Sequence, residues 1–148
     1  ITTHQADPPK NCQLYHAIGA GPLILPTLKT TEEAFVAYKN NKKIRDVIGE
    51  NKRNARSAIG LTEDGSILLV MAAQNKGAKG PSGLTLNELK DWMAAKGVVK
   101  ALSLDGGSSS SMTYGKKTFF GKLGANQNRI QRPIKSAWIV RYCPSCQP

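Results

Sequence analysis

Hydrophobic and polar positions along this chain follow patterns that predict several short strands. Ser57–Leu61 and Ser66–Ala73 have the clearest strand patterns, and Thr62-Glu63-Asp64-Gly65 between them is typical of a hairpin turn in which glycine supplies the positive φ. The apolar run Val98–Leu104 predicts another strand. Weaker strand patterns occur at Leu14–Ile18, Leu23–Leu25, Ser136–Tyr142 and in a hairpin over Ser111–Phe120.

Helical periodicity is strongest after Thr85. Thr85 and Glu88 have the spacing of a capping box, and Gly97 is a natural end for the helix. Four large apolar residues repeat at helical spacing and are expected to face the core: Leu86, Leu89, Trp92 and Met93. A short helix is also expected at Thr31–Tyr38, and a turn of helix near Ile44–Ile48.

The order of these elements predicts the fold class. A strand, a helix and another strand follow one another between Ser66 and Leu104, so the helix should cover one face of a sheet. The chain has 148 residues, with no internal repeat and no dividing linker. We therefore expect one α+β domain over residues 1–148, with a mixed, largely antiparallel sheet covered by a few helices.

Charge narrows the range of partners. The chain has 21 Lys and Arg against 10 Asp and Glu, a net charge of +11. Such a surface favours phosphates, acidic glycans or other anions. The few aromatic residues do not alternate with the basic ones, so no nucleic-acid partner is expected. No apolar run approaches the roughly 18 residues of a membrane span.

The cysteines are Cys12, Cys143 and Cys146. The last two have Cys-x-x-Cys spacing, but no second cysteine or histidine pair accompanies them, and His4 and His16 are far apart. A metal site is therefore not expected, and nothing else in the sequence calls for a cofactor. A disulfide from Cys12 to Cys143 or Cys146 is the preferred interpretation, which predicts an oxidising compartment.

The most distinctive chemistry lies at the end of the strand that precedes Asp105. Asp105 is followed by Gly106, Gly107 and four serines, Ser108–Ser111. A carboxylate at a strand end, followed by flexible backbone and small donors, is suited to a polar or anionic group. On the local pattern alone, an ordinary turn after a strand is the favoured interpretation.

Several separated blocks together resemble the phosphodiester glycosidase domain family, which includes the uncovering enzyme N-acetylglucosamine-1-phosphodiester α-N-acetylglucosaminidase. The blocks are residues 17–24, 56–60, 82–89, 104–107 with the following serines, and Arg132 before residues 136–140. Ser108 and Ser111 replace the glycine and threonine of the family pattern. The family's upstream Asn-Gly-Gly-Phe-Phe-like segment has no counterpart before Ala17, so a second chain or subunit could complete the domain.

The resemblance implies a hydrolase that cleaves a sugar-1-phosphodiester in a phosphorylated or anionic glycan, in a secreted, extracytoplasmic or cell-envelope setting. Asp105 would act as acid/base or stabilise an oxocarbenium-like transition state, with Ser109 and Ser110 as hydroxyl donors or, less favourably, nucleophiles. The expected substrate-binding residues are Gly21, Arg56, Thr85, Gly106, Gly107 and Arg132. The alternative is a non-catalytic module that binds an anionic glycan or a protein with the same pocket.

Overall fold

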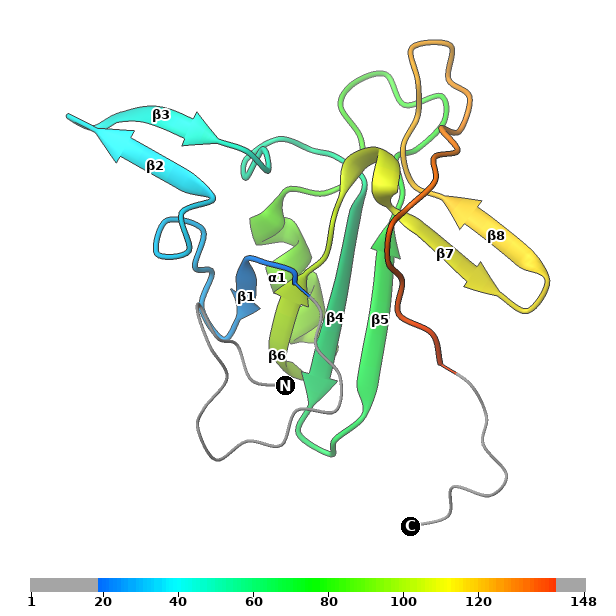
Figure 1. The fold of residues 1–148 in the computed structure, drawn as a ribbon, viewed down its shortest axis with the longest axis horizontal. Coiled ribbons are helices and arrows are strands. Elements are labelled where there is room, and N and C mark those ends of the chain that lie inside the picture. The colour runs from blue at the N-terminus through cyan, green and yellow to red at the C-terminus, as the bar shows by residue number, and fades with distance from the viewer. Residues whose placement is uncertain (1–18, 141–148) are drawn as a thin grey trace.

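Antiparallel strands account for most of the regular secondary structure in residues 19–140, the part of the chain that the computed structural model describes (Figure 1). Its elements follow the order β1 (Leu23–Leu25), β2 (Val36–Lys39), β3 (Lys42–Asp46), β4 (Arg56–Thr62), β5 (Ile67–Ala72), α1 (Leu86–Ala95), β6 (Val98–Ser103), a 3-10 turn (Gly107–Ser109), β7 (Ser111–Tyr114) and β8 (Lys117–Phe120). The predicted strand Leu14–Ile18, both histidines and all three cysteines lie outside the described residues, so the disulfide stays a prediction. Within residues 19–140, no helix is long and apolar enough to cross a membrane.

A four-stranded antiparallel sheet carries the structure, with strand order β1-β6-β4-β5. The β4–β5 hairpin runs in register from Arg56 opposite Ala72 to Leu61 opposite Ile67, and Gly65 in its turn has a φ of +84°. This confirms the predicted hairpin. β6 then returns along the other side of β4, which places the end of β6 beside the start of β4.

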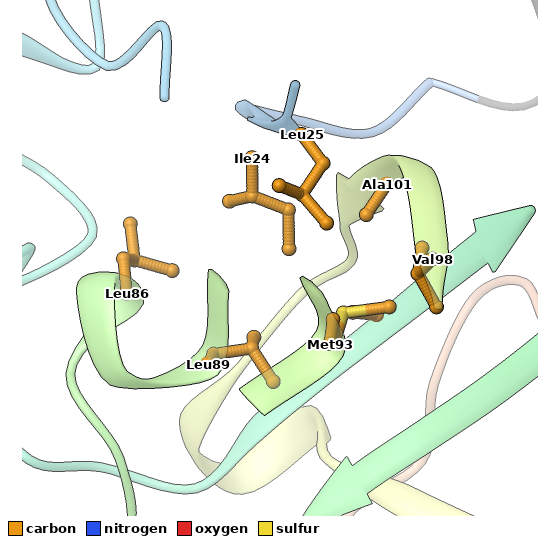
Figure 2. Packing of buried hydrophobic residues seen from close by; sticks show 8 residues of the cluster. Ile24, Leu25, Leu86, Leu89, Met93, Val98 and Ala101 are labelled. Carbon is orange, nitrogen blue, oxygen red and sulfur yellow. The ribbon is translucent and has the colours of Figure 1, made fainter. Parts of the chain in front are cut away.

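Helix α1 packs across one face of this sheet and supplies much of the core (Figure 2). Its capping box is formed as predicted: the Thr85 hydroxyl accepts a hydrogen bond from the Glu88 amide, and Glu88 Oε2 accepts one from the Thr85 amide. Several apolar side chains from the helix, β1 and β6 meet in this core: Leu86, Leu89, Met93, Ile24, Leu25, Val98 and Ala101. Gly60 lies beneath them, where a Cβ would come within 2.7 Å of Met93 Cε.

The expected α+β class is wrong, because the described residues are mostly β and contain a single α-helix of 10 residues. All paired strands are antiparallel, and the structure contains two further ribbons, β2–β3 and β7–β8. The β7–β8 hairpin agrees with the prediction for Ser111–Phe120. The β2–β3 ribbon replaces two predicted helical segments.

The ribbon forms because the two residues between its strands make a hairpin turn. Asn40 and Asn41 both have positive φ, 49° and 60°, the combination that a two-residue type I′ turn requires. Before it, residues 30–34 form a turn and Val36–Lys39 form β2, so Thr31–Tyr38 is not a helix. The segment near Ile44–Ile48 is likewise not helical, because Lys42–Asp46 form β3.

Two smaller predictions also fail. Trp92 is 43% exposed rather than part of the core, since it lies at the margin of the helix face and borders a groove along β5. The described part of the predicted last strand, Ser136–Val140, is exposed and pairs with no strand within residues 19–140. Apolar residues alone do not make a strand when no neighbouring strand offers hydrogen bonds.

The core around α1 can be tested by truncating its central leucine. Leu89→Ala should lower the free energy of unfolding by about 2–5 kcal/mol, because Leu89 is fully buried and its removal leaves a cavity. Asn87→Ala, at an exposed position of the same helix, should change it by about 0.5 kcal/mol or less. Denaturant titration of both variants measures the difference, and equal effects would contradict the packing described for α1.

Candidate functional site

A cleft with a volume of about 470 Å³ lies where the loop after β6 meets the chain before β1 and the start of β4. Its lining residues come from five separate stretches of sequence: Gly19–Gly21, Phe35, Val47–Ile48, Asn54 with Arg56, and Ser103–Gly107. Arg56 and Asp105 are the charged residues among them. The strand order explains why these residues meet, because antiparallel pairing places the start of β4, with Arg56, beside the end of β6, which leads to Asp105.

The guanidinium of Arg56 is bound on nearly every side by backbone carbonyls. Its Nε donates to Leu84 O at 3.0 Å and its Nη1 to Ile48 O at 2.8 Å. Its Nη2 donates to both Gly49 O at 2.6 Å and Lys52 O at 2.8 Å. These contacts occupy four of the five N–H donors of an arginine side chain. Arg56 therefore connects β4 to the 48–52 loop and to the residue before the N-cap of α1.

Burial sets the electrostatic character of Arg56. The side chain is only 4% exposed, and desolvation lowers its pKa, while the nearby Asp46 carboxylate opposes that change. Arginine keeps its charge even so, because its ordinary pKa is far above neutral pH. The wall of the cleft thus contains a permanent positive charge whose hydrogen bonds go mainly to the protein.

Asp105 lies at the mouth of this cleft on a loop that is fixed on both sides. Leu104 N donates to Ser57 O at 2.8 Å, and Gly107 N donates to Ala55 O at 2.8 Å. The Asp105 side chain itself is exposed, and its carboxylate has no hydrogen-bond or ion-pair partner within residues 19–140. A rigid backbone therefore presents an unpaired carboxylate to the cleft.

The two glycines after Asp105 differ in what they can offer a ligand. Gly107 has a φ of +60° and its amide is already bound to Ala55 O, so it shapes the loop. The Gly106 amide has no partner within the described chain. A Cβ on Gly106 would lie 3.1 Å from Ala55 O, a contact closer than most side chains allow. Glycine is therefore needed here for close packing of the loop against β4.

Asn54 and Lys122 belong to this site although their sequence surroundings gave no signal. Lys122 Nζ donates to Asn54 Oδ1 at 2.9 Å, and the Ala55 amide donates to the same oxygen at 3.0 Å. Because both partners are donors, they fix which end of the Asn54 amide is oxygen and turn Nδ2 the other way. That nitrogen lies beside Gly107, 3.5 Å from where a Cβ would be. The pair is 68 residues apart in sequence, so only the fold reveals it.

The remaining predicted residues are distributed unevenly around the cleft. Gly21 lines it, and its amide donates to Ser103 O at 2.9 Å. Arg132 is exposed, and its Nη1 donates to Ser108 Oγ at 3.2 Å. Ser108 directly follows Gly107, the last residue of this loop that lines the cleft. Four predicted residues are not among those that line the cleft: Arg132, Thr85, Ser109 and Ser110.

Thr85 and Ser110 have contacts of their own away from the cleft. The Thr85 side chain caps α1. Ser110 is 1% exposed, its carbonyl accepts a hydrogen bond from Gly121 N at 2.7 Å, and its Oγ has no partner in the described chain. Residues 19–140 also contain no group of three or more metal-ligating side chains. The described site thus consists of one carboxylate, one buried cation and a small set of neutral and charged donors.

The chain is similar to one protein family and to two solved structures. A family model described as phosphodiester glycosidase matches residues 1–141. A hypothetical protein from Synechocystis has a similar crystal structure, with 31% identity over 69% of this chain and a TM-score of 0.53. A second structure, described as "Putative exported protein" from Burkholderia pseudomallei K96243, has 34% identity over 53% of this chain and a TM-score of 0.43. No curated protein sequence matches significantly.

Both solved structures are much longer than the matched region. The match covers 17% of the Synechocystis chain and 15% of the Burkholderia chain. This chain therefore spans less than a fifth of the length of either structure.

The contacts of Arg56 predict a mainly structural penalty when its guanidinium is removed. Arg56→Met keeps much of the apolar stem but leaves buried carbonyls without donors, so the free energy of unfolding should fall by about 2–5 kcal/mol. Arg132→Met removes the same group from an exposed position and should cost about 0.5 kcal/mol or less. Thermal and urea unfolding measure both. A stability loss for Arg132→Met equal to that of Arg56→Met would contradict the role assigned to the buried guanidinium.

Proposed function

Because this chain belongs to the phosphodiester glycosidase family, we propose that its cleft hydrolyses the bond between the anomeric carbon of a sugar and a phosphodiester. The observation that carries this proposal is the Asp105 carboxylate, which has no hydrogen-bond or ion-pair partner within residues 19–140 and is held on a fixed loop beside the buried cation Arg56. A carboxylate without a protein partner in such a cleft is available for a water molecule or a reacting sugar. The permanent positive charge favours an anionic group next to it.

In the proposed reaction, a water oxygen bonds to the anomeric carbon as the bond from that carbon to the phosphate oxygen breaks. Asp105 accepts a proton from the water and stabilises the positive charge that develops on the sugar ring. The electron pair of the broken bond leaves with the phosphate, which becomes a phosphomonoester. Phosphate is a weak base, so its departure depends less on a general acid than that of an ordinary alcohol.

Several donors could hold the phosphate while this bond breaks. The Gly106 amide, which has no partner within residues 19–140, and the Nδ2 of Asn54 are neutral donors, and Lys122 adds a charge close to Asn54. We assign Arg56 a contribution through its charge and through the shape of the cleft wall, since four of its donors are occupied. Arg132 would approach from the rim through Ser108, and Ser109 and Ser110 would support the loop rather than react.

A non-catalytic glycan-binding module is the second candidate. It is favoured by one observation: Asp105 is the single carboxylate among the residues lining the described cleft, whereas most glycosidases use two. Glu33 lies just behind the lining, but its Oε2 accepts a hydrogen bond from Leu23 N at 3.1 Å and so has a structural contact already. An extracytoplasmic location for either function rests on the predicted disulfide.

Replacing the carboxylate of Asp105 separates the two candidates. Asp105→Asn should reduce sugar release from an N-acetylglucosamine-1-phosphodiester by at least about 100-fold, because the amide cannot accept the proton. Asp91→Asn removes the same charge from the exposed side of α1 and should leave turnover unchanged. Released sugar and the melting temperature of each variant are measured together. Binding of the phosphodiester without turnover by the wild-type protein would favour the binding module.

The Lys122–Asn54 contact makes a separate prediction. Lys122→Met should lower kcat/KM by about 10- to 100-fold, the equivalent of a lost charge-assisted hydrogen bond, mostly through a higher KM. Lys122→Arg should restore part of this loss because it returns the charge. Lys116→Met, at an exposed position in the β7–β8 turn, is the matched control. A KM unchanged in Lys122→Met would remove Lys122 from the phosphate site.

A further inference from the structure

One face of the β2–β3 ribbon carries three positively charged residues. Its register pairs Ala37 with Arg45 and Lys39 with Lys42. Directly paired residues in an antiparallel ribbon point to the same side, and Ala37 and Lys39, which alternate along β2, share a side. The register shifts between Ala37 and Tyr38, so the sides of the β3 residues follow from their partners on β2. Lys39, Lys42 and Arg45 therefore share one side, which we call the cationic face. All three side chains belong to exposed residues.

The acidic residues Asp46 and Glu50 contact the opposite face of the ribbon and do not neutralise the cationic face. Lys43 lies there with Tyr38, and its Nζ is 5.8 Å from the centre of the tyrosine ring. The same Nζ is 3.3 Å from Asp46 Oδ2 and 3.6 Å from Glu50 Oε2. The cationic face, by contrast, has no acidic partner within the described part of the chain. Its three charges are available to an external anion.

The ribbon is continuous with the wall of the cleft. Phe35 precedes β2, and Val47 and Ile48 follow β3; all three line the cleft. Val47 N donates to Phe35 O at 3.2 Å, which closes the base of the ribbon. From this base the ribbon extends away from the four-stranded sheet (Figure 1). Four residues of β2 at about 3.3 Å each give it a reach of roughly 13 Å beyond the cleft.

We propose that the cationic face binds phosphates of a repeating glycosyl-phosphate polymer while the cleft holds one phosphodiester of the same chain. This inference rests on the proposed function and identifies its substrate class as an anionic polymer rather than a single small phosphodiester. Flexible, exposed lysines and an arginine suit phosphates that are spaced along a chain, because each can adjust to a charge at a slightly different position. Additional contacts outside the cleft raise the affinity for long substrates only.

The chemistry of the cationic face favours an anionic glycan over a nucleic acid. Binding of single-stranded nucleic acid combines charge with aromatic platforms on which bases stack. The aromatic residue of the ribbon, Tyr38, lies on the opposite face beside Lys43. The cationic face therefore offers contacts for phosphates without an aromatic platform for bases.

Binding is tested with a triple variant in which Lys39, Lys42 and Arg45 are each changed to Gln. The background is Asp105→Asn, so that polymer is not consumed and the result does not depend on turnover. The matched control changes Lys76, Lys79 and Lys116 to Gln, which removes the same charge from exposed loops elsewhere. The probes are a linear polymer of hexose-1-phosphate repeats, a single sugar phosphodiester, and single-stranded DNA of equal charge, all in low salt.

The expected result is polymer binding at least about tenfold weaker in the ribbon variant, with binding of the single phosphodiester unchanged and the control within about twofold of its parent. An equal loss of polymer binding in the ribbon and control variants would overturn the proposal, because net charge alone would then explain the effect. DNA binding that is as tight as polymer binding and equally dependent on the ribbon would also overturn it. Failure of the proposed hydrolysis would instead appear as no turnover by the wild-type protein, with these binding differences intact.

Discussion

The contact between the Arg56 guanidinium and four backbone carbonyls is the interaction on which the cleft depends. Ile48, Gly49 and Lys52 lie in a loop without regular structure, and Leu84 lies just before α1. Without a common donor, these carbonyls would need water or a different backbone path to satisfy them. One side chain from β4 thus replaces the secondary structure that these segments lack, and it brings its charge to the wall of the cleft.

Asp105 depends on the same framework from the other side. The hydrogen bonds from Leu104 and Gly107 to residues around the start of β4 determine where its carboxylate lies. Asn54 adds a third connection, because its side chain accepts from Lys122 while its backbone exchanges hydrogen bonds with Leu84. One short stretch, residues 54–57, therefore positions the acid, the buried cation and the amide donors. A site assembled around a single stretch can keep its geometry even though its parts come from distant regions of the chain.

The parts of the fold that sequence predicted correctly are those encoded by neighbouring residues. Thr85 and Glu88 form their capping box within one turn, and Gly65 satisfies a turn between two adjacent strands. The helix predicted at Thr31–Tyr38 does not form, because the Asn40–Asn41 turn pairs β2 with β3. The partnership of Lys122 with Asn54 could not be predicted at all, since no local pattern records a contact between side chains so far apart. The motif around Asp105 predicted residues that line the cleft. It could not predict that the donors of Arg56 are bound to backbone carbonyls, because those contacts exist only in the folded chain.

The double bridge between Asn54 and Leu84 links the beginning of α1 to the cleft. Asn54 N donates to Leu84 O, Leu84 N donates to Asn54 O, and Arg56 Nε shares the Leu84 carbonyl. The next residue is the N-cap of α1, so the start of the helix and the cleft wall are joined by the same hydrogen bonds. A ligand that orders the cleft would therefore slow amide exchange at the start of the helix. The helix cap also determines part of the conformational entropy that the protein loses when the ligand binds.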